Sequence, residues 1–557
     1  MSAVIAPHEL AAIPLFSAVA PEDLERLART AADLHLGAGE YAVHEGDVRA
    51  LLVVLSGKLV VTKKIDGIER TIGARGPGQI FGEITIIFGT PFQGSYRATE
   101  PSRVMRVEAR QFHALVTSAP QVLTEVGALA RERIGGLQGI AAAPATPRAL
   151  IVAHRWDTAG HALRRFLSRN QITFEWLTPD APDVAARWPG TPPADADCPA
   201  LRCDDGKILI RPSTRDLAQR LGLQTCPRGT DYDTVIIGGG PAGLAAAVYG
   251  ASEGLRTIVI ESEAPGGQAG TSSRIENYLG FPTGVSGDEL AQRALQQARR
   301  LGAEIMVTRS VVGIEPDARK VLLDGGESLG AKTIVIATGV SWRRLAIEGF
   351  DVLLGKGVYY GAARSDASMT QGLDVHLIGA GNSAGQAALF FANHARTVTL
   401  VVRGDSLDKS MSHYLIEQVR GKSNIRVELE SEVKAVHGEG HLAAIDVLDR
   451  RSGTVRRCES GGVFVFIGAD AETAWVPAAI ARDERGYLLT GDAVVRAGRW
   501  SGSRDPYLLE TSVPGVFACG DVRSSPVKRV AAAVGEGSMA IAFIHQYLQN
   551  QATRTTA

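Results

Sequence analysis

The sequence lacks three features that would assign the chain to a particular class at once. No run of eighteen or more apolar residues occurs in its 557 residues, so we expect no membrane-spanning helix. Lys and Arg total 59 against 60 Asp and Glu, a formal net charge of −1, so no positive surplus is available for nucleic acid or an anionic membrane. The opening MSAVIAPHEL has no basic segment followed by an apolar one, and we expect no signal peptide.

Cysteine is also scarce. The chain has five, an odd number without repeated short spacing, which excludes a secreted disulfide framework. The closest pair, Cys198 and Cys203, has neither the spacing of a zinc pair nor that of a redox CxxC motif, so we expect no metal site. These features favour a reducing cytoplasm.

The chain is too long for one hydrophobic core, and its length predicts three or four domains. Hydrophobic residues make up 45% and charged residues 21%, which is typical of a globular protein. The stretch from Gly135 to Pro147 is rich in small residues and contains prolines, and we predict a linker there. A second break is predicted at Gln224 to Thr230.

Residues 13–134 have the pattern of a small β-roll with flanking helices. Pro21 to Thr30 has amphipathic helical spacing, and strand-length segments separated by glycines follow it. The segments Glu45-Gly46-Asp47, Ser56-Gly57-Lys58-Leu59 and Phe81-Gly82-Glu83 come in the order seen in cyclic nucleotide-binding domains. This part of the chain resembles that family.

The resemblance places Glu83 where the family binds the ribose 2′-hydroxyl. The family also has an Arg about ten residues later as the countercharge to the phosphate, but here Phe92 or Gln93 takes that position and Arg97 comes on the next strand. Losing such a contact costs roughly 2–3 kcal/mol, because only backbone dipoles would then hold the phosphate. We therefore favour a docking or dimerising β-roll over cyclic nucleotide binding, with an unknown ligand as a third possibility.

Residues 147–225 have a strand–helix–strand pattern followed by a hairpin and a helix. The first helix is predicted at Thr158 to Asn170, and Asp205-Gly206 marks the hairpin turn. The pattern resembles the glutaredoxin and thioredoxin group, with Pro199 at the position of its cis-proline. That group has a CxxC after the first strand, whereas this chain has His154-Arg155-Trp156-Asp157, so we predict a structural spacer or adaptor.

A complete dinucleotide-binding fingerprint begins at Tyr232. An apolar β-branched run enters Gly238-Gly239-Gly240-Pro241-Ala242-Gly243, a helix pattern follows, and a strand then ends at Glu261. Gly238 allows the tight turn, and Gly240 lets the pyrophosphate approach. Gly243 lets the helix pack closely, and Glu261 is expected to hold a ribose hydroxyl.

A second fingerprint begins at Val375. It continues through Gly379-Ala380-Gly381-Asn382-Ser383-Ala384 and a helix pattern to a strand that ends at Arg403. A cation in place of the ribose carboxylate favours the 2′-phosphate of NADP over NAD.

The order of one dinucleotide unit, an inserted second unit and a return to the first resembles bacterial low-molecular-weight thioredoxin reductase. Its flavin segments are matched by Gly266-Gly267-Gln268, Ile275 to Pro282, Ala337-Thr338-Gly339, Cys519-Gly520-Asp521 and Lys528-Arg529-Val530. The resemblance implies FAD and NADPH as cofactors, a homodimer, and a Cys519 without a chemical role.

The expected architecture is a multidomain chain. It has a cyclic nucleotide-binding-like β-roll with flanking helices at 1–140 and a thioredoxin-like α/β insert without CxxC at 147–225. Two Rossmann-like α/β three-layer domains follow, the FAD domain at 231–345 and 465–557 and the NADP domain at 346–464. The FAD residues expected are Gly238, Gly240, Pro241, Ala242, Gly243, Glu261, Gly267, Gln268, Asn277, Val312, Thr338, Gly339, Asp521, Arg529 and Val530. The NADP residues expected are Gly379, Gly381, Asn382, Ser383, Ala384 and Arg403.

Two departures from the reductase family affect its chemistry. The family has a CxxC in a segment beginning GVxYC, but here Gly361 and Arg364 take the cysteine positions. Because disulfide exchange needs a thiolate, reduction of thioredoxin by the usual route should fail. Arg529 replaces a Gln, and it either stabilises the anionic reduced flavin or points to solvent or the linker.

The sequence therefore predicts an NADPH-dependent FAD oxidoreductase with an acceptor other than a resident disulfide. A ferredoxin or flavodoxin-like protein, a quinone, oxygen and a disulfide all remain candidates for that acceptor. No catalytic side chain is named, since the cofactors carry the chemistry. The alternatives are a redox sensor, in which FAD and NADPH set a conformation read by the N-terminal domains, and disulfide reduction by a non-standard route.

Overall fold

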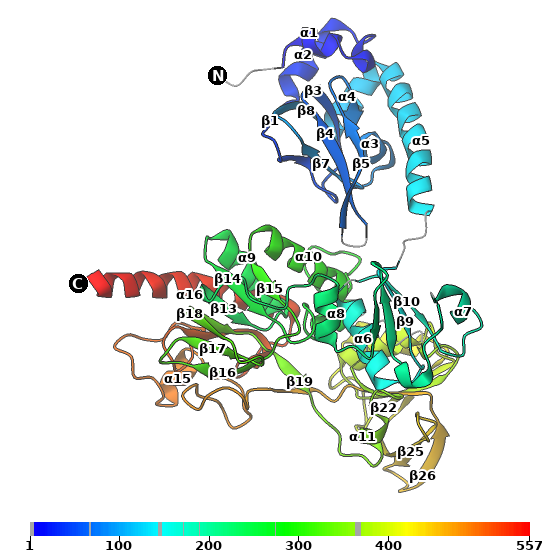
Figure 1. Ribbon diagram of the computed structural model, residues 1–557, viewed down its shortest axis with the longest axis vertical. Coiled ribbons are helices and arrows are strands. Elements are labelled where there is room, and N and C mark those ends of the chain that lie inside the picture. Colours follow the sequence, from blue (N-terminus) through cyan, green and yellow to red (C-terminus); the bar gives the residue numbers. More distant parts are fainter. Residues whose placement is uncertain are drawn as a thin grey trace. The chain divides into compact units, whose positions relative to one another are not determined.

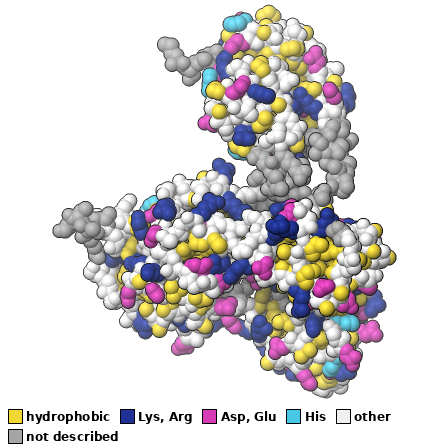
Figure 2. Space-filling model, in the orientation of Figure 1, with side chains coloured by type: hydrophobic (Ala, Val, Ile, Leu, Met, Phe, Trp, Pro, Cys, Tyr) yellow, Lys and Arg dark blue, Asp and Glu magenta, His cyan; other side chains and the backbone are white. Residues whose placement is uncertain are grey.

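The computed structural model describes residues 5–65, 68–142, 147–170, 172–188, 190–272, 274–361 and 369–556. The chain forms two compact units, Met1–Thr146 and Pro147–Ala557 (Figure 1). No helix among the described residues is both long and apolar enough to cross a membrane. On the face drawn in Figure 2, both basic and acidic side chains are present.

The first unit is a β-roll of two four-stranded antiparallel sheets, with strand orders β1-β8-β3-β6 and β2-β7-β4-β5. Its strands are β1 (Ala32–Leu36), β2 (Tyr41–Val43), β3 (Ala50–Ser56), β4 (Leu59–Ile65), β5 (Ile68–Arg75), β6 (Ile80–Phe81), β7 (Ser95–Ala98) and β8 (Ser102–Glu108). Its helices are α1 (Pro7–Ala11), α2 (Pro21–Thr30), α3 (Glu83–Phe88), α4 (Ala109–Ser118) and α5 (Pro120–Ala142). The predicted β-roll and the bounds predicted for α2 are confirmed.

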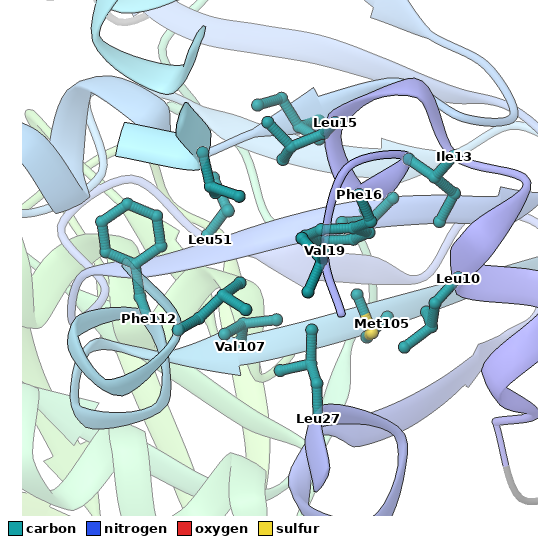
Figure 3. Packing of buried hydrophobic residues seen from close by; sticks show 14 of the residues in the cluster. Leu10, Ile13, Leu15, Phe16, Val19, Leu27, Leu51, Met105, Val107 and Phe112 are labelled. Carbon is teal, nitrogen blue, oxygen red and sulfur yellow. The ribbon is translucent and has the colours of Figure 1, made fainter. Parts of the chain in front are cut away.

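A hydrophobic core holds the helices of this unit against one sheet. Phe16 precedes α2, Leu51 and Met105 lie on neighbouring strands, and Phe112 lies on α4; all four are at most 1% exposed (Figure 3). Because β3 is buried on both faces, it reads as a continuous apolar run rather than an alternating one.

The linker predicted from Gly135 begins later, since α5 continues to Ala142. The glycines at 135, 136 and 139 each weaken a helix by only about 1 kcal/mol, and the Leu, Gln, Ile and Ala between them are tolerated in helices. The next residue pair contains Pro144, which cannot continue a helix. Residues 143–146 lie outside the described part of the chain.

The second unit begins with the insert, a four-stranded mixed sheet of order β10-β9-β11-β12. Its elements are β9 (Ala149–Val152), α6 (Thr158–Arg169), β10 (Phe174–Leu177), α7 (Val184–Arg187), β11 (Ala200–Cys203), β12 (Ile208–Ile210) and α8 (Thr214–Arg220). The peptide bond before Pro199 is cis, as the thioredoxin-like pattern predicts. Asp157, where that family has its CxxC, caps α6 by accepting bonds from the Ala159 and Gly160 N–H groups.

The FAD-type fold is a seven-stranded sheet. It contains β13 (Asp231–Ile237), β14 (Thr257–Ile260), β15 (Glu304–Met306), β16 (Val311–Glu315), β17 (Lys320–Leu323), β18 (Ser328–Ile336) and β29 (Val516–Ala518). Strands β15, β14, β13, β18 and β29 pair in parallel, which requires both faces to be covered. Helices α9 (Pro241–Ser252) and α16 (Val530–Thr556) pack along each other over one face, near α10 (Gly287–Arg300) (Figure 1).

The NADP-type fold is a five-stranded parallel sheet of order β20-β27-β21-β22-β23. Its strands are β20 (Val358–Tyr360), β21 (Asp374–Ile378), β22 (Thr397–Val401), β23 (Ile425–Glu428) and β27 (Gly462–Val465), with helices α11 (Phe350–Leu353), α13 (Asn382–Phe391) and α14 (His413–Arg420). An antiparallel sheet of β24 (Ser431–His437), β25 (Ala444–Asp449) and β26 (Val455–Glu459) adjoins it. The ribbon formed by β19 (Val340–Trp342) and β28 (Ala469–Ala471) joins the two folds, so the expected two-Rossmann architecture is confirmed.

Candidate dinucleotide-binding site

The first glycine-rich loop connects β13 to α9 at the carboxyl edge of the parallel sheet. Gly238 has φ +104°, and a Cβ there would lie 2.5 Å from the Ala337 carbonyl oxygen. A Cβ on Gly243 would lie 1.9 Å from the Gly238 carbonyl oxygen, so only glycine lets α9 pack this closely. Gly240 has no such neighbour, its nearest contact being Gly267 Cα at 3.9 Å, which leaves room for a ligand to approach.

Glu261 ends β14 directly beside this loop. Its carboxylate accepts hydrogen bonds from the Gly239 N–H at 2.8 Å and the Glu263 N–H at 2.9 Å. The residue is 8% exposed, and burial raises the pKa of the carboxyl group. Glu261 therefore also organises the loop, a role that the sequence pattern did not reveal.

A cavity of about 740 Å³ opens beside this loop. The expected FAD residues that line it are Gly238, Gly240, Pro241, Ala242, Glu261, Gly267, Gln268, Thr338, Gly339, Asp521, Arg529 and Val530. These residues come from six separate segments of the chain, and the fold brings them to one place.

Three expected FAD residues do not line this cavity. Asn277 is exposed and lies outside it. Val312 is 54% exposed, and its neighbour Val311 lines the cavity instead, because alternate residues of a strand face opposite sides. Gly243 packs against the loop, which is the role predicted for it.

The end of the cavity near α16 carries three charged groups. Asp521 lies in a short 3₁₀ turn, and burial raises the pKa of its carboxyl group while Lys528 opposes that shift. Arg529 directly precedes α16; it is exposed and also lines the cavity. This position is compatible both with a role at the flavin and with a side chain that points to solvent. Burial raises the pKa of the Cys519 thiol to about 12, so a thiolate does not form there at neutral pH.

The second glycine-rich loop repeats the geometry of the first. Gly379 has φ +144°, and a Cβ there would lie 2.3 Å from the Phe466 carbonyl oxygen. Gly381 adopts φ −87° and ψ 177° before α13, close to the −72° and −176° of Gly240 before α9. Asn382 accepts a hydrogen bond from the Ser412 N–H at 2.7 Å.

Of the expected NADP residues, only Ser383 lines the 740 Å³ cavity; Gly379, Gly381, Asn382, Ala384 and Arg403 do not. Ala384 is fully buried in the core of the NADP-type fold. The remaining side chains on this wall are those of Gln386, Ala387 and Phe390, one helical face of α13. Both fingerprint helices thus reach a single cavity.

Arg403 is exposed two residues after β22, and a second arginine lies beside it. The Arg450 guanidinium donates to the Arg403 carbonyl oxygen at 3.1 Å. Arg450 follows β25, far away in sequence, so the strand-end pattern could not reveal it. The fold therefore brings a second arginine to the backbone of Arg403, and this arginine also lies 3.9 Å from the Glu432 carboxylate.

Gly361, in the first of the two missing cysteine positions, is closely packed. Its φ is +74°, and a Cβ there would lie 3.0 Å from the Trp342 ring. Arg364, in the second position, lies outside the described residues.

Two arginines of the insert also line the 740 Å³ cavity, and sequence patterns gave no sign of them. Arg165 and Arg169 lie on the face of α6 that meets the reductase folds. Arg169 donates to the carbonyl oxygens of Ala264 and Gly267, each at 3.1 Å, so it braces the segment that precedes Gln268.

The segment that replaces the insert's CxxC also contacts the NADP-type fold. Trp156 stacks on His441 with ring centroids 5.3 Å apart, and Arg155 donates to the Met369 carbonyl oxygen. Through these contacts the insert is attached to the NADP-type fold, as expected of a spacer or adaptor.

The first unit has its own cavity of about 250 Å³ beside α3. Glu83 is 2% exposed there and lies 3.0 Å from the Arg133 guanidinium. Arg75 lines the same cavity, and burial lowers the pKa of its guanidinium. The expectation that only backbone dipoles face an anion there is wrong, because β5 and α5, distant in sequence from α3, supply two arginines.

The residues of the larger cavity fit FAD and a nicotinamide dinucleotide. Gly240 leaves open space where a pyrophosphate must approach, a buried acidic side chain follows the next strand, and the helix after a second loop of the same geometry lines the same cavity.

Comparisons with known proteins agree with this geometry. Residues 232–537 match the pyridine nucleotide-disulphide oxidoreductase family, and residues 33–119 match the cyclic nucleotide-binding domain family. Thioredoxin reductase from Treponema pallidum (strain Nichols) is 33% identical over 311 residues, 56% of this chain and 95% of that protein. The enzyme of that name from Bacillus subtilis (strain 168) is 31% identical over 321 residues, covering 57% and 95%. The crystal structure of T. acidophilum thioredoxin reductase superimposes with a TM-score of 0.51 at 28% identity, covering 58% of this chain and 99% of that one.

Thioredoxin reductase-like members of this family use FAD and NADPH. The first family match covers more than half of the chain. The chain therefore belongs to the pyridine nucleotide-disulphide oxidoreductase family: it is an NAD(P)H-dependent flavin oxidoreductase of the thioredoxin reductase-like type that also carries a cyclic nucleotide-binding domain.

Proposed function

We propose that this chain passes reducing equivalents from NADPH through FAD to an acceptor other than a resident disulfide. In this proposal the β13–α9 loop, Glu261, Gln268 and Asp521 hold FAD, and the β21–α13 loop with Arg403 holds NADPH. FAD, when bound, accepts a hydride and releases two electrons. The protein's task is then to bind both dinucleotides, orient them and exclude water.

One observation carries the proposal: α9 and α13 line the same cavity. The FAD loop supplies Gly238 and Gly240, and α13 supplies Gln386 and Phe390 from the facing fold. Hydride transfer depends on close approach of the two rings, so a shared cavity provides the required proximity without a catalytic side chain.

Anaerobic mixing of the FAD-loaded protein with NADPH tests the proposal. We expect the yellow flavin absorbance to bleach and then recover over many cycles when ferricyanide is added. Flavin that bleaches and then stalls would favour the alternative of a redox sensor with little turnover.

Disulfide reductase activity by a non-standard route is the other alternative. Gly361 lacks a side chain and is closely packed against Trp342. We therefore expect no NADPH-dependent reduction of thioredoxin or of an aromatic disulfide. Strong activity with either substrate would contradict the argument from the missing thiols.

The pair Arg403 and Arg450 supports NADPH over NADH. Arg403 follows β22, with Arg450 bonded to its backbone, and a charge-assisted contact from Arg403 to a 2′-phosphate would contribute about 1.5–3 kcal/mol. We expect Arg403→Ala to raise the KM for NADPH by about tenfold or more and to leave that for NADH nearly unchanged. Arg426→Ala, at an exposed position on β23, serves as the control. An unchanged KM for NADPH would remove this role of Arg403.

We also propose that the first unit binds a small anion through Arg75 and Arg133. The two guanidinium groups line one cavity with the buried Glu83 and so supply the charge that the segment after Glu83 lacks. Calorimetry with cyclic AMP and cyclic GMP tests whether that anion is a cyclic nucleotide. Micromolar binding that Arg75→Ala abolishes would support a cyclic nucleotide-regulated enzyme.

We further propose a homodimer in the cytoplasm. The dimer rests on the resemblance to thioredoxin reductase, and the location is supported by the absence of disulfides, since all five cysteines are free. Analytical ultracentrifugation measures the assembly, and a monomer at micromolar concentration would refute the dimer.

A further inference from the structure

A second cavity of the second unit, about 620 Å³, lies between the insert and the reductase folds. One of its walls is a single face of α6, since Thr158, His161, Ala162, Arg165 and Arg169 recur at helical spacings of three, one, three and four. A volume of this size is in the range of small-molecule sites.

The opposite wall is aromatic. Trp342 from β19 and Tyr359 and Tyr360 from β20 line it, and Gly361 follows directly after them. The segment that would carry a redox cysteine thus contributes two tyrosines and a glycine packed against Trp342 to a cavity wall. Because successive residues of β20 face opposite sides of the strand, Tyr359 and Tyr360 do not form one flat surface, and a planar aromatic ligand would contact individual rings.

This cavity borders the dinucleotide cavity. Arg165, Arg169, Glu263, Ser341 and Trp342 line both of them. The two cavities therefore share part of their walls, and a ligand in the second cavity would lie next to the dinucleotide cavity, as an electron acceptor must.

The charged residues that line the cavity are three arginines, at 165, 169 and 344, and two glutamates, at 263 and 472, so positive charge is in excess by one. Arg165 Nε is buried and makes no hydrogen bond with the described residues, and its guanidinium lies 3.7 Å from Glu263, whose carboxylate accepts a hydrogen bond from Arg169. Arg344 lies over the Tyr360 ring at 5.8 Å. Two arginines beside aromatic rings complement a planar molecule with an acidic group.

We propose that this cavity binds the electron acceptor and that the acceptor is a small aromatic quinone with a negative charge. The inference rests on the proposed function, because it names the acceptor of that reaction. NADPH gives up a hydride and becomes NADP⁺, and the quinone takes two electrons and two protons, one carried by the hydride and one from solvent. The net reaction, NADPH plus H⁺ plus quinone giving NADP⁺ plus hydroquinone, balances.

Calorimetric binding of naphthoquinone sulfonate to the FAD-loaded full chain, without NADPH, tests the proposal. Ala162→Trp places an indole in the cavity from an exposed position of α6, and we expect it to weaken binding by about tenfold or more. Ala159→Trp is the matched control, because Ala159 is also exposed on α6 but lies outside the cavity, and its affinity should stay within about twofold of the wild type. Circular dichroism and FAD content verify that each variant folds.

A charge variant separates recognition of the anion from stacking. Arg165→Gln should weaken binding of the sulfonate more than binding of the uncharged naphthoquinone. Equal affinities of Ala162→Trp and Ala159→Trp, or no binding by the wild type, would overturn the proposal.

Turnover with ferricyanide distinguishes failure of the quinone site from failure of NADPH oxidation. If the wild type oxidises NADPH with ferricyanide but does not bind the quinone, this proposal fails and the proposed function stands. If the quinone binds and NADPH is not oxidised with either acceptor, the proposed function fails, and the quinone's role as an acceptor fails with it.

Discussion

The local structure at Gly361 disfavours a cysteine at this position, so the missing disulfide could not be restored by substitution alone. Its φ of +74° disfavours any Cβ, and the Trp342 ring would lie 3.0 Å from that atom. The first cysteine position is therefore packed for glycine.

A stability comparison tests this packing. Gly361→Ala should destabilise the protein by about 2 kcal/mol, whereas Gly372→Ala, with the same φ of +74° and no atom within 4 Å of its Cβ, should cost about 1 kcal/mol. Urea unfolding measures both. Equal losses would show that the contact with Trp342 carries no energy.

His376 makes the NADP-type fold sensitive to acid. The residue is 6% exposed on β21, bonded to Ser460 Oγ at 2.9 Å, and burial lowers its pKa from 6.5 to about 4. Below pH 6.5 the unfolded chain binds a proton that the folded chain does not bind until about pH 4, so stability falls as the pH falls through that window.

The loss attributable to His376 should approach about 3 kcal/mol at the acid end of the window. We expect His376→Asn to flatten the dependence of the unfolding free energy on pH between 7 and 4, while His413→Asn, at an exposed site, leaves it unchanged. If the unfolding free energy of His376→Asn depended on pH as steeply as that of the wild type, the acid sensitivity would belong to other groups.

At the scale of elements, local patterns predicted helices such as α2 and α6, but not where α5 ends or which surfaces the helices contact. The spacing of Leu163, Phe166 and Leu167 predicted helix α6, because that face is buried in the insert's own core. The opposite face carries Arg165 and Arg169, whose partners lie about a hundred residues further along the chain, and no local pattern encodes such contacts.

The same limit applies to the dinucleotide loops. Glycine positions were predictable because close approach of the backbone excludes a Cβ. Asn277, Val312 and the arginines at 75, 133 and 450 were misplaced or missed, because side-chain direction and long-range pairing depend on tertiary packing.

Helix α6 should contribute to FAD retention through Arg169. The side chain is 11% exposed and donates to the carbonyl oxygens of Ala264 and Gly267 next to the FAD loop. Arg169→Ala should weaken FAD binding by about tenfold, measured as the flavin-to-protein absorbance ratio after dialysis. Arg187→Ala, which removes surface ion pairs of the same insert, is the control. Unchanged retention in Arg169→Ala would confine its role to packing.

At the scale of the whole molecule, the chain divides at residue 146 into two compact units. All the residues that line the two larger cavities belong to the second unit. A chain of residues 147–557 should therefore retain FAD and NADPH-dependent ferricyanide reduction, with kcat within about twofold of the full chain when no effector is present. Loss of FAD from the shortened chain would show that the first unit supports the site directly.

The central claim is that this oxidoreductase carries electrons past reduced flavin without a thiol. Anaerobic stopped-flow absorbance with NADPH, followed by ferricyanide and separately by oxidised thioredoxin, tests it most directly. The account predicts rapid flavin bleaching, repeated turnover with ferricyanide and no turnover with thioredoxin. Flavin that NADPH does not bleach, or sustained turnover with thioredoxin, would contradict it.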